Sequence, residues 1–290
     1  MTDITERLEY TASDDPFYDF CLWEYTPVCS WENKFRSANL LFHSFEMMNV
    51  SENMFALVQA IRERFGPLRT VWGLKKMGDE ISWEFYFYDY RRRERERSIT
   101  RLLDAVGPLV NCRIRPDENI HYFMFSIDVS DELVSGNRAL EEIHMYIGNP
   151  GSTVSSGICY SLTEHGTRLE NFYFFFDAKR QMEEILAKAA CSAHIDTTRI
   201  NIPQILWPEM RGCEVIVIAN KQENDAVYFS RININQLMCF LKKMAYPPKI
   251  VSFIEENRFR LDHLLYDVGF DYRMEDDDLR ILKSGYYGIF

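Results

Sequence analysis

The sequence predicts an α/β fold in which ten antiparallel strands close into a barrel with a polar lumen and helices outside. Strand-like segments come in pairs joined by short turns, which makes the paired strands antiparallel, and helical segments separate the pairs about five times. The strands also alternate between an apolar face and a face rich in tyrosine. A closed sheet covered by helices buries both faces and leaves no unpaired edge.

Length and composition fit one large domain. The chain has 290 residues, 47% of them hydrophobic, and no linker divides it, so we expect a single domain over residues 1–290. The net charge of -11 argues against nucleic acid or anionic lipid as a partner. No apolar run approaches the roughly 20 residues that span a bilayer. Seven cysteines without a CxxC pair fit a reducing, cytoplasmic setting. The oligomeric state stays open.

Apolar periodicity and capping residues give the order of the elements. The predicted helices are 51–65, a segment from Ile99 to Val106, one capped by Asp177 and carrying Met182 to Ala189, one capped by Asn233 and carrying Leu237 to Met244, and one from Ile250 to Ile254. The predicted strands are 68–76, 81–90, a weaker one at 112–115, 121–128, 143–148, 157–163, 169–176, 213–220, 226–231, 268–273 and 279–289.

The two faces of the strands differ in chemistry. In 81–90, an apolar face of Ile81, Trp83, Phe85 and Phe87 opposes Ser82, Glu84, Tyr86, Tyr88 and Tyr90. In the last strand, Ile281, Lys283, Gly285, Tyr287 and Ile289 share a face by the same alternation. A face turned to water would favour Lys, Glu and Thr over Tyr. The tyrosines therefore favour a closed barrel over the alternative, an open sheet backed by helices.

A lumen lined by tyrosines and a few charges predicts a small-molecule site. Tyrosine rings shelter a cation through their quadrupoles, and hydroxyls with basic side chains hold phosphate. This lining suits a reaction that expels diphosphate and passes through an allylic carbocation. It also suits a non-catalytic barrel that binds an apolar or aromatic small molecule.

Three segments resemble the soluble aromatic prenyltransferases of the ABBA-barrel family, the bacterial phenol and naphthalene type, whose fold has five α-β-β-α repeats around a ten-stranded barrel. They are Met124-Phe125-Ser126-Ile127-Asp128 with the strand Ile143-His144-Met145-Tyr146, Leu169-Glu170-Asn171-Phe172-Tyr173-Phe174, and Lys283-Ser284-Gly285-Tyr286-Tyr287. The order of elements matches the family from about residue 68 to the end. The resemblance implies transfer of a dimethylallyl or longer prenyl group from its diphosphate to an electron-rich aromatic acceptor.

The resemblance also implies roles for individual residues. Lys283 would bind diphosphate, and we expect Arg273 and Arg231 as further lumen cations. The predicted catalytic residues are Lys283, His144 and Tyr287. The pocket and its cation shield would comprise Tyr86, Tyr88, Tyr146, Asn171, Tyr173 and Tyr287. His144 stands where the family has a lysine, and Arg231 is only a stand-in for a family arginine, so the predicted site is less cationic than the family pattern. Glu84 falls where magnesium-using members place an Asp, and magnesium use stays open.

Each candidate also has an ordinary structural interpretation. Lys283 would be a lysine ion-paired with Asp271, His144 a hydrogen-bonded barrel histidine, and Glu84 the partner of a nearby basic residue. The tyrosines would simply fill the lumen. The alternating run 91–97 is expected to begin a solvated helix.

Overall fold

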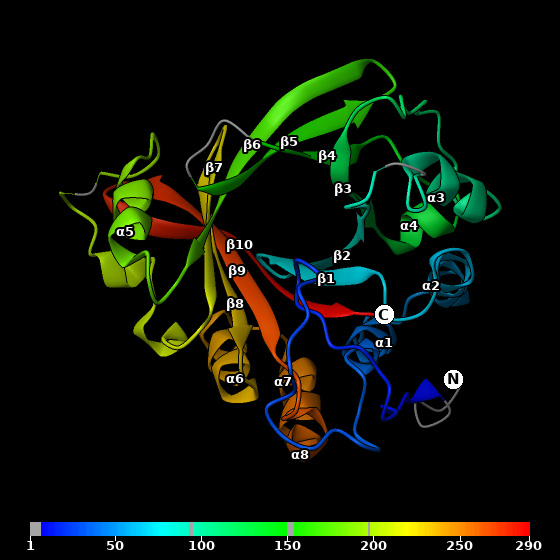
Figure 1. Ribbon diagram of the computed structural model, residues 1–290, viewed down its shortest axis with the longest axis horizontal. Helices are drawn as coiled ribbons and strands as arrows, with labels where there is room; N and C mark the ends of the chain where they lie inside the picture. Colours follow the sequence, from blue (N-terminus) through cyan, green and yellow to red (C-terminus); the bar gives the residue numbers. More distant parts are fainter. Residues whose placement is uncertain (1–6, 93–94, 150–153, 197) are drawn as a thin grey trace.

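The computed structural model describes residues 7–92, 95–149, 154–196 and 198–290, and these form a closed antiparallel barrel of ten strands (Figure 1). Each strand pairs with its neighbour in the chain, and β1 pairs with β10 to close the ring. The strands are β1 Val71–Met77, β2 Glu80–Tyr88, β3 Tyr122–Val129, β4 Ile143–Gly148, β5 Ser155–Thr163, β6 Gly166–Asp177, β7 Val215–Lys221, β8 Asp225–Ile232, β9 Tyr266–Glu275 and β10 Asp278–Ile289. The predicted fold class is confirmed.

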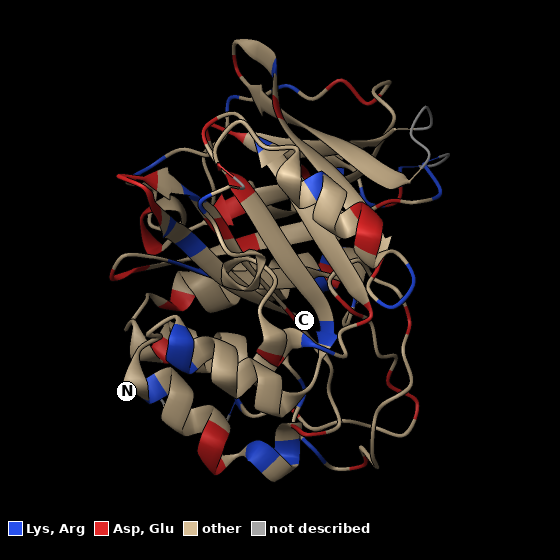
Figure 2. Ribbon diagram, turned by 90° about the vertical axis from the view of Figure 1, so that its left-hand side faces the viewer, with Lys and Arg blue, Asp and Glu red and all other residues tan. Residues whose placement is uncertain are grey.

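The helices lie on the outside of the ring (Figure 1). They are α1 Ala38–Met47, α2 Glu52–Phe65, α3 Ile99–Val106, α4 Asp131–Val134, α5 Met182–Ala190, α6 Ile234–Lys243, α7 Pro248–Glu256 and α8 Arg258–Leu261, with short 3-10 turns at Ile202–Gln204 and Pro208–Met210. Basic and acidic residues are interspersed over these outer helices and loops (Figure 2). In the part of the chain described, no helix has the length and apolarity needed to cross a bilayer.

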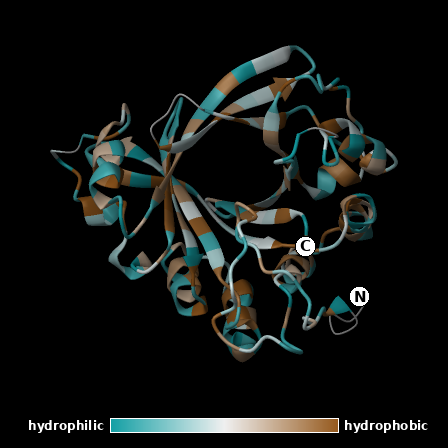
Figure 3. Cartoon of the chain, viewed as in Figure 1, coloured by the Kyte–Doolittle hydropathy of each residue, from teal (hydrophilic) through white to brown (hydrophobic). Residues whose placement is uncertain are grey.

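Two separate apolar clusters lie on the two faces of the sheet. The outer cluster packs strand residues such as Phe85 and Val268 against the helices, and the inner cluster includes Tyr86, Tyr146 and Tyr287. The strand ribbons accordingly change between hydrophilic and hydrophobic bands along their length (Figure 3). The predicted division of the faces is confirmed, because Trp83, Phe85 and Phe87 belong to the outer cluster and Tyr86 and Tyr88 to the inner one.

The barrel is closed by the last strand. β10 pairs with β1 from Val71 opposite Ile289 to Lys76 opposite Ser284. Phe290 continues the ladder, because its N–H donates to the Thr70 carbonyl at 2.9 Å. The Phe290 side chain is buried and meets the Phe85 ring at a centroid distance of 4.8 Å. The closing seam is therefore anchored in the outer core.

Bulges reset the alternation of two strands. In β10, Ile281 lies opposite Tyr272 and Lys283 opposite Asp271, so one extra residue separates them. The prediction that Ile281 shares the face of Lys283 is wrong for this reason, and the Ile281 side chain lies outside, where it is 38% exposed. In β8 the register shifts between Phe229 and Ile232.

Other local predictions were corrected. No strand forms at 112–115, where the structure has only an isolated bridge between Cys112 and Leu140. Asp177 accepts hydrogen bonds from the N–H groups of Lys179 and Arg180, so it caps a turn, and α5 begins later at Met182. The described part of 91–97 forms turns rather than a helix start, and residues 93–94 lie outside the described residues.

Candidate functional site

The lumen contains two chambers that meet at four tyrosines. The apolar chamber encloses about 220 Å³ and the polar chamber about 140 Å³. The tyrosines that line both chambers are Tyr86 on β2, Tyr146 on β4, Tyr173 on β6 and Tyr228 on β8. Alternation within each strand turns these rings inward, since their chain neighbours belong to the outer core or lie outside. One molecule could thus contact both chambers across the tyrosines.

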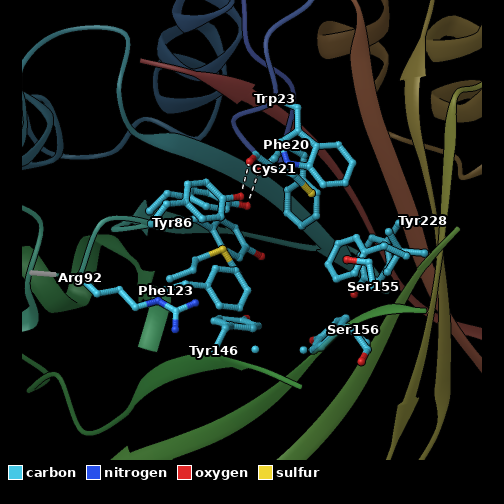
Figure 4. Close-up of a pocket in the computed structure, with 18 residues that line it drawn as sticks. Phe20, Cys21, Trp23, Tyr86, Arg92, Phe123, Tyr146, Ser155, Ser156 and Tyr228 are labelled. Atoms are coloured by element: carbon cyan, nitrogen blue, oxygen red, sulfur yellow. Dashed lines mark hydrogen bonds between the residues drawn. The ribbon is translucent and has the colours of Figure 1, made fainter. Parts of the chain in front are cut away.

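Aromatic side chains make up most of the wall of the apolar chamber (Figure 4). Besides the shared tyrosines, the wall includes Phe20, Trp23, Tyr88, Tyr90, Phe123, Met124 and Phe175. Arg92 is the one charged side chain among the described residues that line it. Burial raises the pKa of Tyr86, Tyr146, Tyr173 and Tyr228 well above the usual value, so these phenols stay neutral. The chamber suits a flat apolar molecule.

Three lysines from distant parts of the chain meet in the polar chamber. Lys75 on β1, Lys221 on β7 and Lys283 on β10 all line it. Their side chains are 13%, 10% and 35% exposed. Repulsion from Lys221, together with burial, lowers the pKa of Lys283. Such a cluster of partly buried ammonium groups is typical of a site for a multivalent anion.

Carboxylates accompany each lysine. The Lys221 Nζ lies 2.8 Å from Oδ2 of Asp271, and the Lys283 Nζ lies 3.5 Å from the same oxygen. Burial would raise the pKa of Asp271, but the charges of Lys221 and Lys283 outweigh it and lower that pKa. Lys75 pairs with Asp128 and, at 3.0 Å, with Glu84. The cluster therefore has balanced charge, with the ammonium groups held in place by the acids.

Glu84 is a buried carboxylate with three partners inside the barrel. It accepts hydrogen bonds from the Tyr86 hydroxyl at 2.7 Å and the Ser126 hydroxyl at 2.6 Å, besides its ion pair with Lys75. Burial would raise its pKa, but Lys75, then His144 and the Ser126 hydrogen bond, hold it well below the usual range. Across the described ranges, no three His, Cys, Asp or Glu side chains gather as metal ligands. These contacts do not suit Glu84 to the predicted role of metal ligand.

Glycines make room for the lumen tyrosines. Tyr228 lies directly across the strand pair from Gly269, and Tyr287 across from Gly73. A Cβ on Gly269 would lie 2.2 Å from Cδ1 of Tyr228, and one on Gly73 would lie 2.7 Å from Cε1 of Tyr287. Each ring therefore lies flat over a glycine of the neighbouring strand. This arrangement keeps the chambers open beside large side chains.

An N-terminal segment, residues 17–25, closes one end of the apolar chamber. Phe20 enters the lumen and stacks on Tyr228 with ring centroids 6.1 Å apart. Its N–H donates to Oδ2 of Asp267 at 2.6 Å, and the Tyr88 hydroxyl donates to its carbonyl. Arg231 fixes the segment through Asp19, with Nε 2.9 Å from Oδ2. The wall of the chamber thus depends on a buried cluster of two carboxylates and one guanidinium.

Asp267 makes the stability of this cluster depend on pH. Burial, and then the charge of Asp19, raises the pKa of Asp267 to about 7, above the unfolded value near 3.8. The folded state therefore holds the proton more tightly, so this contribution to stability is complete below about pH 4 and is lost as the pH rises to about 7. We expect the contribution of this group to the free energy of unfolding to fall by about 3 kcal/mol between pH 4.5 and 7.5.

Urea denaturation of the wild type and of Asp267→Asn at pH 4.5, 6 and 7.5 measures this contribution. The asparagine cannot titrate, so the free energy of unfolding of the wild type should fall relative to that of Asp267→Asn as the pH rises over that range. If the two stability curves stay parallel from pH 4.5 to 7.5, the raised pKa is refuted.

Most of the predicted site residues come together in the structure. The polar chamber is lined by Tyr86, His144, Tyr146, Asn171, Tyr173, Lys283 and Tyr287. Tyr88 lines the apolar chamber instead. The His144 ring reaches Glu142, with Nε2 3.9 Å from its carboxylate, and the Asn171 amide donates to the Tyr173 hydroxyl at 3.3 Å.

Two predicted cations lie elsewhere. Arg273 is near the turn end of β9 and pairs with Glu275 at 2.6 Å, outside the lining of both chambers. Arg231 sits in the β8 bulge with a positive φ of 62°, and its guanidinium is taken up by Asp19 and Glu214. The prediction that these arginines join Lys283 at a diphosphate is therefore corrected.

Four residues that line the chambers were not predicted from the sequence: Lys75, Lys221, Tyr228 and Arg92. Lys75 shares the inward face of its strand with Gly73, and it neighbours Lys76 on the opposite face, so alternation could have identified it. Tyr228 could have been found as the inward neighbour of Phe229. Lys221 ends a strand that was expected to stop at Asn220. Arg92 was grouped with the solvated run 91–97, and no periodicity marks it.

Comparison with known proteins provides no assignment. No protein-family model matches the chain, and no curated protein matches it significantly in sequence.

Proposed function

We propose that the protein is an aromatic prenyltransferase that moves a dimethylallyl or longer prenyl group from its diphosphate to an electron-rich aromatic acceptor inside the barrel. One observation carries this proposal. A chamber with three partly buried lysines and a chamber with aromatic walls meet at four tyrosines. The lysines match the anionic head of a prenyl diphosphate, the shared tyrosines match its allylic group, and the apolar chamber matches an aromatic acceptor.

The polar chamber would hold the diphosphate. Lys75, Lys221 and Lys283 supply the ammonium groups, and Asn171 and His144 supply further polar contacts. Charge builds up on the diphosphate as the bond between its oxygen and the prenyl carbon breaks. Prepositioned cations in a buried site stabilise that charge. Lys283, whose pKa is lowered by Lys221 and burial, is also suited to pass a proton to the departing group.

The shared tyrosines would protect the allylic cation from water. The Tyr86 hydroxyl donates to a carboxylate, which makes its ring more electron-rich toward a cation. An aromatic carbon of the acceptor in the apolar chamber then attacks the cation and forms the new carbon–carbon bond. The ring loses the proton on that carbon to the released diphosphate, and this restores aromaticity.

A titration with a non-hydrolysable prenyl thiodiphosphate tests the donor site, with and without magnesium. Micromolar binding, followed by a prenylated product in an acceptor screen with the true diphosphate, is the expected result. If binding depends on magnesium, we expect the magnesium ion to enter together with the diphosphate and not to occupy a preformed site on the protein. No binding in either condition would refute the transferase proposal.

The second candidate is a non-catalytic barrel that binds an apolar or aromatic small molecule. The observation in its favour is that each lysine of the polar chamber already has a carboxylate partner. A balanced cluster attracts a diphosphate less than an unpaired one does. This candidate predicts retention of an aromatic ligand without any product and without binding of the thiodiphosphate.

A further inference from the structure

Arg92 is a cation without an ion-pair partner among the described residues, in a chamber wall that is mostly aromatic. Its side chain reaches into the apolar chamber toward Phe123 and Tyr146 (Figure 4). The guanidinium carbon lies 5.9 Å from the centre of the Phe123 ring. Its Nε is buried and has no hydrogen-bond partner, and no acidic side chain of the described residues pairs with it. A buried polar nitrogen is ordinarily hydrogen-bonded, and one without an acceptor indicates a missing partner.

Other arginines of the chain show the contrast. Arg231 pairs with Asp19 and Glu214, and Arg95 with Asp89 and Glu118. In the polar chamber the lysines are likewise paired with acids. Within the described ranges, Arg92 is therefore a charged group of the lumen without a carboxylate partner, although it lies beside a cavity large enough for a ligand.

The shape of the chamber limits what the partner can be. A cavity of about 150 Å³ holds a benzene, so the 220 Å³ of the apolar chamber has room for about two fused rings. The hydroxyls of Tyr88 and Tyr90 are taken by the carbonyls of Phe20 and Cys21, whereas the Ser156 hydroxyl is without a partner among the described residues and could serve as a second polar contact for a ligand. An aromatic ligand with one anionic group at its edge can stack against the aromatic walls while that group accepts two hydrogen bonds from the guanidinium group.

We propose that the molecule received by this chamber is an aromatic carboxylate, whose carboxyl group binds Arg92. This rests on the proposed function in one respect, that the chamber receives the acceptor. Arg92 does not line the polar chamber, whereas the shared tyrosines do. The acceptor would then be oriented with its carboxylate at Arg92 and its reactive carbon at the tyrosines. The new bond would form at the end of the ring system away from the carboxylate.

Calorimetric titration with two matched probes tests this assignment. 2-Naphthoate and its neutral isostere 2-naphthamide have nearly the same size, so their affinities differ through charge. We expect the wild type to bind naphthoate at least tenfold more tightly. Arg92→Met, which keeps the length of the side chain, should bind both equally, and Arg92→Lys should retain part of the preference because it keeps the charge but not the fork.

The control is Arg180→Met, since Arg180 is 86% exposed on the outside and should leave the preference unchanged. Thermal unfolding of every variant shows that it is folded. The proposal is overturned if the wild type binds neither probe, if it binds the amide as tightly as naphthoate, or if Arg92→Met keeps the preference.

A third titration separates this proposal from the proposed function. Thiodiphosphate binding that survives in Arg92→Met supports a separate donor site at the lysines. If Arg92→Met loses thiodiphosphate but keeps the naphthoate preference, Arg92 serves the donor and the acceptor assignment is overturned. If the wild type binds naphthoate through Arg92 but never binds thiodiphosphate, the transferase proposal fails and the carboxylate site stands.

Discussion

Replacing Lys283 by alanine should reduce turnover about 100-fold or more, once a donor and acceptor pair is established. The change removes one of the three ammonium groups that line the polar chamber, and loss of a single prepositioned donor costs about 10²–10³ in rate. It also leaves the Asp271 carboxylate paired with Lys221 alone, so the negative charge of Asp271 repels the diphosphate more strongly. Steady-state kinetics and thiodiphosphate titration measure the two effects.

Two companion variants make this result specific. Lys283→Arg keeps the charge and should retain a substantial part of the rate. Lys76→Ala removes a lysine on β1 that points away from the lumen, and it should leave turnover unchanged. Near-normal turnover in Lys283→Ala would show that Lys283 serves only as a partner of Asp271.

Gly269→Ala should both destabilise the barrel and close the site. Its Cβ would lie 2.2 Å from Cδ1 and 2.8 Å from Cγ of Tyr228, atoms near the root of the side chain that cannot swing away freely. Phe20 and Tyr287 hold the ring on other sides, at centroid distances of 6.1 and 6.3 Å. We expect a loss of about 3 kcal/mol in the free energy of unfolding, the upper range for overpacking, and loss of ligand binding as the ring moves into the chambers.

A matched glycine and a second substitution test the cause. A Cβ on Gly157 of β5 would find its nearest neighbour at 3.6 Å, so Gly157→Ala should change the free energy of unfolding by less than about 1 kcal/mol. In the Gly269→Ala background, Tyr228→Ala should restore part of the lost stability, because it removes the clashing ring. Additive effects of the two substitutions would contradict the proposed clash.

Alternation along single strands made much of the fold predictable. The tyrosine face and the apolar face of β2 are both visible in the sequence, and they hold because Glu84 and Tyr86 point inward while Phe85 packs on the helices. Lys283 was identified from a resemblance in a short motif, and its inward direction follows from the same alternation. The face to which a side chain belongs follows from its spacing within one strand, so it could be predicted without the structure.

The remainder depends on contacts between distant segments and on bulges. No pattern in the sequence shows that Phe20 enters the lumen or that Asp19 would take Arg231 away from the site. The β10 bulge moved Ile281 to the other face, because one inserted residue changes the parity of everything before it. Arg92 was not predicted, because it belongs to the charged run 91–97, whose composition is typical of a solvated surface.

The seam between β1 and β10 has a consequence for how the protein is made. These strands are separated by almost the whole barrel sequence, so the ring cannot close on the ribosome until the last strand has left the exit tunnel. Until then β1 and β9 present unpaired edges, which invite pairing with other chains. Contacts of such long sequence separation also form slowly. The nascent chain should therefore depend on chaperone protection late in synthesis, and truncation before Lys283 should yield insoluble protein.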